Sequence, residues 1–207
     1  MVNVVHASSL TLGEVQQQFQ LDERLETDLS QFLELQPLTE AQTARMTGIQ
    51  QNWKRYYRNG KVTEGAVKIL SVSPLLTEAG YLANPELRLS LEEQVNEIEI
   101  EDGDRVIRGR MDMLVCRDLG DRAPLCVLVI EAKNSAVNAM EGLPQLLVYM
   151  QSFLEHQEFV WGLVTNGSDY VFVRLERELF RLFRGLSLLF PEDGQHLLQA
   201  LMALGAA

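Results

Sequence analysis

The sequence has no long apolar run and few cysteines, and each scarcity excludes a class of protein. No apolar stretch approaches the roughly 18 residues that a membrane-spanning helix needs, and the N-terminus lacks the charged and then apolar stretches of a secretory signal. We therefore expect a cytoplasmic protein without a membrane partner. The two cysteines, Cys116 and Cys126, lie in apolar stretches. We expect them to be free core thiols rather than a disulfide or part of a zinc site.

Positive charge is also scarce, because 18 lysines and arginines stand against 29 aspartates and glutamates, giving a net charge of −11. This balance argues against strong nonspecific binding of nucleic acid by the whole surface. The charges are segregated, however, since acids dominate residues 14–40 and basic residues dominate 54–68. Residues 54–68 could therefore form a basic patch on an otherwise acidic surface. Residues 54–58 also fit the solvated end of a helix, so both interpretations stay open.

The first part of the chain has helical signals. Thr11 and Glu14 are spaced as a capping box, and Thr39 begins a pattern that predicts a helix to Arg58, ended by Asn59-Gly60. We therefore interpret residues 11–58 as helical. A further helix is predicted from Glu64 to about Ala79, with a kink or break at Pro74.

Extended structure is predicted from about Leu87 onward, because apolar residues there alternate. Asp102-Gly103 is a hairpin signal. The expected strands and helices in this part are strands at 105–117, 125–133, 160–165 and 170–175, helices at 143–156 and 195–204, and an undecided segment at 180–189. We predict an α/β fold, a central mixed β-sheet flanked by helices. Residues 1–60 form a helical N-terminal appendage to the domain at 61–207, packed as one unit.

Three charged side chains interrupt the two apolar strands. Asp112 lies in the strand at 105–117, and Glu131 and Lys133 lie in the strand at 125–133. Side chains alternate across a strand, so Glu131 and Lys133 share a face, and a hairpin would bring Asp112 beside them. Burying these groups is costly unless they bind a metal and substrate or pair with one another. A structural ion pair is therefore the simpler alternative to a catalytic site.

The order of these residues resembles the PD-(D/E)xK nuclease superfamily. Asp112 matches its aspartate and Glu131-Ala132-Lys133 its triplet, although Met111 stands where the superfamily has proline. Gln145 and Tyr149 fit the QxxxY signature of a subset, and Thr165-Asn166-Gly167 resembles the end of a strand in that subset. Over about residues 62–175, the chain is similar to the nuclease domain of the restriction subunit of type I restriction enzymes.

The resemblance implies a restriction-endonuclease-like fold and a Mg²⁺ or Mn²⁺ cofactor. Its implied metal ligands are Asp112, Glu131, the Ala132 carbonyl and Glu64, with Glu78 a weaker alternative to Glu64. Lys133 would steady the attacking water or offset transition-state charge. Gln145 and Tyr149, four apart on one helical face, would border the site and contact the nucleic-acid backbone. Each of these residues also has a purely structural interpretation. Glu64 could be a carboxylate favoured at a helix start, and Gln145 and Tyr149 could be a boundary hydrogen bond and a core ring. Thr165-Asn166-Gly167 is assigned turn chemistry only.

These expectations lead to a metal-dependent nuclease that hydrolyses phosphodiester bonds, with DNA as the expected polymer. The chain lacks a G-x-x-x-x-G-K-[ST] phosphate loop, so it would be restriction-type without a motor. The alternative is a non-catalytic protein-interaction module that retains the nuclease fold, whose acidic surface would suit a protein partner or a second copy of the chain. An RNA-directed or repair nuclease is a third option, because the motif does not encode the polymer.

Overall fold

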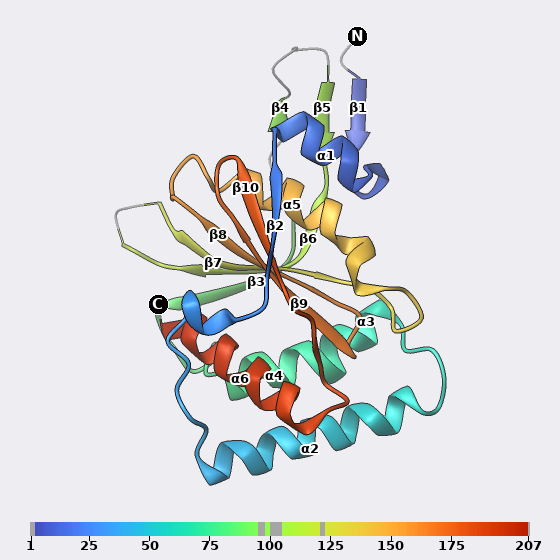
Figure 1. The fold of residues 1–207 in the computed structure, drawn as a ribbon, viewed down its shortest axis with the longest axis vertical. Helices are drawn as coiled ribbons and strands as arrows, with labels where there is room; N and C mark the ends of the chain where they lie inside the picture. Colours follow the sequence, from blue (N-terminus) through green and yellow to red (C-terminus); the bar gives the residue numbers. More distant parts are fainter. Residues whose placement is uncertain (1–2, 95–97, 100–104, 121–122, 207) are drawn as a thin grey trace.

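The fold is described from a computed structural model of the chain, for residues 3–94, 98–99, 105–120 and 123–206. Figure 1 shows a central twisted sheet with helices on both faces. In the described residues the larger sheet has eight strands, in the order β2-β10-β9-β8-β7-β6-β3, with β11 paired to β9. The strands are β2 (Asp22–Glu26), β3 (Leu87–Gln94), β6 (Arg110–Arg117), β7 (Leu125–Ala132), β8 (Val160–Thr165), β9 (Asp169–Leu175), β10 (Leu179–Phe183) and β11 (Leu186–Ser187).

The sheet is mixed, which confirms this part of the expected fold class. The pairs β7–β8 and β10–β2 are parallel, whereas β3–β6, β6–β7, β8–β9, β9–β10 and β9–β11 are antiparallel. A smaller sheet has the order β1-β5-β4, in which β1 (Asn3–His6) runs parallel to β5 (Arg105–Arg108) and β4 (Ile98–Glu99) antiparallel to it.

The helices form one layer on each face of the larger sheet (Figure 1). Apolar side chains of α2, α3, α4 and α6 join one core cluster, and those of α1 and α5 join the other. None of the helices in the described ranges is long and apolar enough to cross a membrane. Their bounds are α1 (Leu12–Phe19), α2 (Glu40–Tyr57), α3 (Glu64–Val67), α4 (Ser73–Glu78), α5 (Leu143–Gln151) and α6 (Pro191–Ala206), with short 3₁₀ turns at Ala7–Ser9, Leu29–Gln31 and Ala139–Gly142.

The helix predicted from Glu64 to Ala79 is present but changes its winding. It runs as α3, then as the π-helical segment η3 (Lys68–Val72), and then as α4. Pro74 lies in the first turn of α4, and its missing N–H prevents an α-type bond to the residue four positions earlier. The predicted break at Pro74 is therefore a wider helical turn just before it.

Several expected elements differ from the structure. Residues 22–26 are a strand rather than a helix, and β2 pairs with β10 of the larger sheet. The strand expected at 105–117 is interrupted at Gly109, and its two parts, β5 and β6, belong to different sheets. The helix expected at 143–156 ends at Gln151. The undecided segment at 180–189 contains β10 and β11, and the division of the chain at residue 60 stays a prediction. The hairpin signal Asp102-Gly103 lies outside the described residues.

The two cysteines face each other across β6 and β7 and are thiols rather than a disulfide, as expected. Burial, together with the nearby Cys116, raises the pKa of the Cys126 thiol well above its usual value. A neutral, buried thiol is unreactive, so we assign this pair to the core.

Candidate active site

The pairing of β6 with β7 brings the two predicted carboxylates together. Met113 pairs with Ile130, so Asp112 and Glu131 are the next residues along the two strands and point to the same face of the sheet. The Asp112 carboxylate reaches across to β7, where its Oδ2 accepts the Ala132 N–H at 2.8 Å. The hairpin expected from the sequence therefore places Asp112 beside Glu131.

Glu131 is the most deeply buried acid of this group, with 2% of its side chain exposed. Its Oε1 accepts a hydrogen bond from Lys133 Nζ at 2.6 Å, whereas its buried Oε2 has no hydrogen-bond partner. Burial and then the charge of Asp112 raise the pKa of Glu131 to about 8, although Lys133 acts in the opposite direction. Burying a carboxylate oxygen without a hydrogen-bond partner costs free energy, so Oε2 of Glu131 is a candidate to bind a ligand.

A hydrogen-bonded chain connects Lys133 to α5. Lys133 Nζ donates to Gln145 Oε1 at 3.1 Å, and Gln145 Nε2 donates to the Tyr149 hydroxyl at 2.7 Å. That hydroxyl also accepts the Arg110 N–H at 3.2 Å, two residues before Asp112. Burial and then the charge of Glu131 raise the pKa of Tyr149 to about 12. The predicted residues Gln145 and Tyr149 thus lie on the same face as Lys133 and support it.

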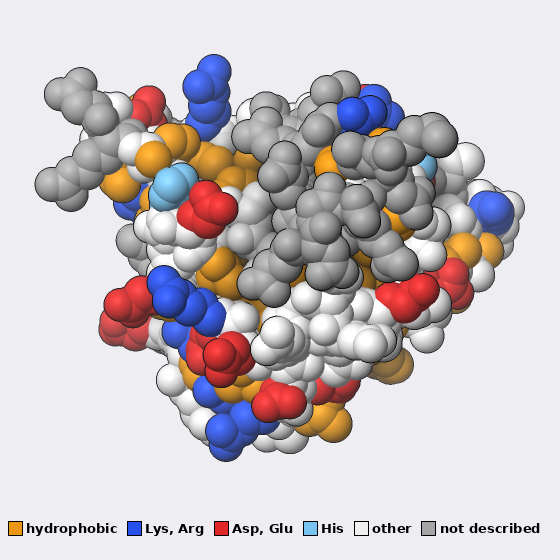
Figure 2. All heavy atoms as spheres, turned by 90° about the horizontal axis from the view of Figure 1, so that it is seen from above, with side chains coloured by type: hydrophobic (Ala, Val, Ile, Leu, Met, Phe, Trp, Pro, Cys, Tyr) orange, Lys and Arg blue, Asp and Glu red, His pale blue; other side chains and the backbone are white. Residues whose placement is uncertain are grey.

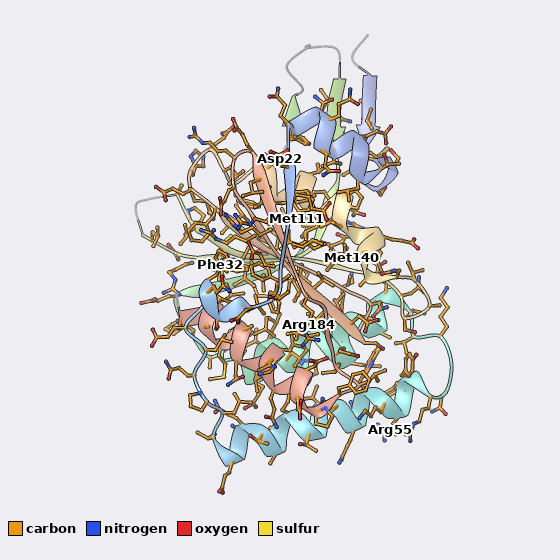
Figure 3. The ribbon with its side chains drawn as sticks, in the orientation of Figure 1. Asp22, Phe32, Arg55, Met111, Met140 and Arg184 are labelled. Carbon is orange, nitrogen blue, oxygen red and sulfur yellow. The ribbon has the colours of Figure 1, made fainter. Side chains whose placement is uncertain are left out.

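Two glycines allow α5 to lie this close to the strands. A Cβ atom on Gly109 would lie 2.5 Å from Cε1 of Tyr149 and 2.7 Å from its hydroxyl. A Cβ atom on Gly142, just before α5, would lie 3.0 Å from Cγ of Glu131. Figure 3 labels Met111 and Met140, the first beside Asp112 on β6 and the second in the turn that ends at Gly142.

Lys68 is a member of the site that the sequence reasoning did not single out. Its Nζ donates to Asp112 Oδ1 at 2.6 Å and lies 3.6 Å from Glu64 Oε1. Burial acts to lower the pKa of Lys68, but the hydrogen bonds and charges of Asp112 and, to a lesser extent, Glu64 together outweigh burial and raise it. The available sequence signal was the spacing of Glu64 and Lys68, four residues apart on one helix.

The two candidate acids of the α3–α4 segment lie in different places. Glu64 has 46% of its side chain exposed and its Oε1 lies 3.6 Å from Lys68 Nζ, and its charge also helps to raise the pKa of Glu131. Glu78 instead pairs with Arg45 of α2 at 2.6 Å, so no contact of Glu78 with Asp112 or Glu131 supports it as a ligand. The preference for Glu64 over Glu78 as a metal ligand stays a prediction.

The chemistry of the site fits a hard divalent cation held by two carboxylates. In the part of the chain that the structure describes, no group of three or more His, Cys, Asp or Glu side chains is arranged to hold a metal. Mg²⁺ is often bound by one or two carboxylates and keeps several waters. Asp112 and the unpartnered Oε2 of Glu131 match this smaller donor set. The Ala132 carbonyl and Glu64 stay predictions as further ligands.

The Thr165-Asn166-Gly167 turn positions the strand ends beside the site. The Thr165 carbonyl accepts the Lys133 N–H at 2.7 Å, and Asn166 Nδ2 donates to the Val137 carbonyl at 3.0 Å. Gly167 has a φ of +87° and lies against Trp53, where a Cβ atom would come within 2.3 Å of the indole ring. The turn therefore has the structural role expected from the sequence.

Comparisons with known proteins identify little. No protein-family model matches the chain, and no curated protein matches it at a significant level. A solved fragment from Vibrio vulnificus YJ016, assigned to the HsdR subunit of a type I restriction enzyme, aligns at 21% sequence identity with a TM-score of 0.39. The alignment covers 64% of this chain and 24% of that one. A likeness at this level establishes neither the fold family nor the activity of this chain.

Proposed function

We propose that this chain is a metal-dependent nuclease of the PD-(D/E)xK type, with a restriction-endonuclease-like fold, that hydrolyses phosphodiester bonds in DNA. The observation that carries the proposal is the buried, unpartnered Oε2 of Glu131 beside Asp112, with the Lys133 ammonium 2.6 Å from the other Glu131 oxygen. A purely structural ion pair is expected to satisfy both oxygens of its buried carboxylate, whereas one oxygen of Glu131 has no partner.

The proposed chemistry assigns one task to each side chain. Asp112 and Glu131 would hold Mg²⁺ or Mn²⁺, which neutralises phosphate charge and lowers the pKa of a bound water. Lys133 would offset the negative charge that grows on the phosphate during attack. Gln145 and Tyr149 hold the Lys133 ammonium in position, because a misplaced charge stabilises a transition state poorly.

The nucleic acid needs a positive surface near this site. A shallow groove of about 510 Å³ is lined by Gln51, Lys54, Arg55, Arg58 and Asn59 at the end of α2; Arg55 is labelled in Figure 3.

The end of α2 is linked to the catalytic strand by a short path. Val62 and Ser135 exchange hydrogen bonds, in which Val62 N–H donates to Ser135 Oγ at 2.8 Å and Ser135 N–H donates to the Val62 carbonyl at 3.0 Å. Ser135 is two residues beyond Lys133. We assign this groove, with its three basic side chains, to the phosphates of the nucleic acid. On the face seen in Figure 2, by contrast, charges of both signs are interspersed.

Plasmid nicking by the purified chain with Mg²⁺ or Mn²⁺ tests this proposal. The isosteric variants Asp112→Asn and Glu131→Gln should be inactive, whereas Glu78→Gln, which removes a carboxylate outside the site, should retain activity. If the wild type cleaves neither DNA nor RNA and binds no metal, the nuclease proposal fails and a non-catalytic interaction module replaces it. Cleavage of RNA alone would retain the site and change the polymer.

A further inference from the structure

The Lys68 ammonium forms an ion pair with Asp112, one of the two carboxylates proposed to bind the metal. Both oxygens of Asp112 are engaged, Oδ2 by the Ala132 N–H and Oδ1 by Lys68 Nζ at 2.6 Å. The side chains of Lys68 and Asp112 are 17% and 13% exposed, so this ion pair is shielded from solvent. A divalent cation cannot approach Oδ1 closely while the ammonium remains there, because the two positive charges repel each other.

The backbone under Lys68 is unusual in a way that supports a functional role. Lys68 is the first residue of η3, the π-helical segment, and such segments often mark functional sites. Ser71, in the same segment, donates its hydroxyl to the Gly167 carbonyl at 2.9 Å and is hydrogen-bonded to the Tyr170 hydroxyl. The segment is therefore anchored to the β8–β9 turn and to β9.

Glu64 offers the ammonium a second position. Its Oε1 is 3.6 Å from Lys68 Nζ, and nearly half of its side chain is exposed. A lysine has a long flexible stem and three donors, so a small rotation would move its charge from Asp112 to Glu64. Glu64 can thus act on the site without touching a metal.

We propose that the Lys68 ammonium occupies the cation position of Asp112 in the metal-free protein and shifts to Glu64 when a divalent metal binds. The inference rests on the proposed function, and it makes Lys68 a gate on metal binding and Glu64 its acceptor rather than a metal ligand. The gate keeps Asp112 neutralised until the metal arrives, which lowers the cost of burying two carboxylates side by side.

Metal affinity, measured without nucleic acid, tests the gate. Mn²⁺ binding to the full chain is measured by calorimetry for the wild type, Lys68→Met and Lys61→Met. Lys68→Met should bind Mn²⁺ at least about tenfold more tightly, because no charged hydrogen bond has to be broken. Lys61 is exposed, and its replacement removes the same charge nearby without freeing Asp112. Lys61→Met should change the Mn²⁺ affinity by less than about threefold, as expected for an exposed charge.

A double-mutant comparison separates the two roles of Glu64. If Glu64 receives the displaced ammonium, Glu64→Gln weakens Mn²⁺ binding when Lys68 is present and has no effect in the Lys68→Met background. If Glu64 is a metal ligand, Glu64→Gln weakens binding equally in both backgrounds, and the proposed acceptor role is wrong.

A third measurement needs no variant, so it holds even if Lys68→Met does not fold. Acetylation of the wild type by an amine-reactive ester, followed by peptide mass spectrometry, should label Lys68 several-fold faster with saturating Mn²⁺, relative to Lys61. An unchanged labelling ratio, or an unchanged affinity in Lys68→Met, overturns the gate while leaving the nuclease proposal intact. Absence of Mn²⁺ binding in every protein overturns both.

Discussion

The replacement of Glu131 by glutamine should change how the stability of the metal-free protein depends on pH. The pKa of Glu131 is raised from 4.5 to about 8, first by burial and then by the charge of Asp112. The folded state therefore holds a proton that the unfolded state releases, so stability is highest below the unfolded pKa and falls as pH rises through the folded pKa. One pKa unit corresponds to about 1.4 kcal/mol, which sets an upper limit of roughly 5 kcal/mol on this loss.

The assay is urea denaturation of wild type and Glu131→Gln with a chelator at pH 5.5 and pH 8.5. The variant cannot ionise at this position, so it should be more stable than the wild type by a few kcal/mol at pH 8.5 but by only about 1.4 kcal/mol at pH 5.5, one unit above the unfolded pKa. Saturating Mg²⁺ at pH 8.5 should restore the wild type alone, since only the wild type can use an ionised carboxylate to bind the metal. Parallel stability curves at the two pH values would refute the assigned environment of Glu131.

Three further outcomes follow from the site. Lys133→Ala should lower turnover by at least about 100-fold while changing Mn²⁺ affinity by less than about threefold, because an ammonium is no ligand for a cation; single-turnover kinetics and calorimetry measure the two, and equal losses would contradict its role. Reversing Lys54 and Arg58 to glutamate should weaken DNA binding for all sequences alike and flatten its salt dependence by about two units, and unchanged binding in a salt titration would place the contact elsewhere. Gly109→Ala should lower the free energy of unfolding by about 1–3 kcal/mol, because its Cβ would overlap Tyr149. In denaturation experiments, Gly109→Ala combined with Tyr149→Leu should be no less stable than Tyr149→Leu alone. If the two losses of stability add instead, the strain does not come from Tyr149.

Local signals in the sequence predicted many of the elements. The helix after Thr11 has the predicted capping box, because this motif depends on residues three apart in the chain. The helix predicted from Thr39 is also present, and it begins with a capping box of Thr39 and Gln42 that was not predicted. Strand β2 was missed since its residues, Asp22–Glu26, are mostly exposed and charged, and only its pairing with β10 makes it a strand. The break at Gly109 was also missed; the backbone there lies close to the Tyr149 ring, a contact 40 residues away along the chain that no local pattern indicates.

The candidate site was predictable as far as its residues lie on adjacent strands and on one helix face. Asp112, Glu131 and Lys133 meet because side chains alternate along paired strands, and Gln145 and Tyr149 join them by helical spacing. Lys68 was not predicted, since its contact with Asp112 spans 44 residues and begins at a π-helical turn. No local pattern in the sequence specifies the contact of Lys68 with Asp112. The four-residue spacing of Glu64 and Lys68 indicates only that these two side chains can pair with each other.

The central claim is that Asp112 and Glu131 together form a divalent-metal site, and a calorimetric Mn²⁺ titration at pH 8.5 tests it most directly. The wild type should bind Mn²⁺, Asp112→Asn and Glu131→Gln should each lose that binding while keeping a cooperative unfolding transition, and Glu78→Gln should bind as the wild type does. Equal Mn²⁺ affinity in all four proteins, or its absence in the wild type, would contradict the account.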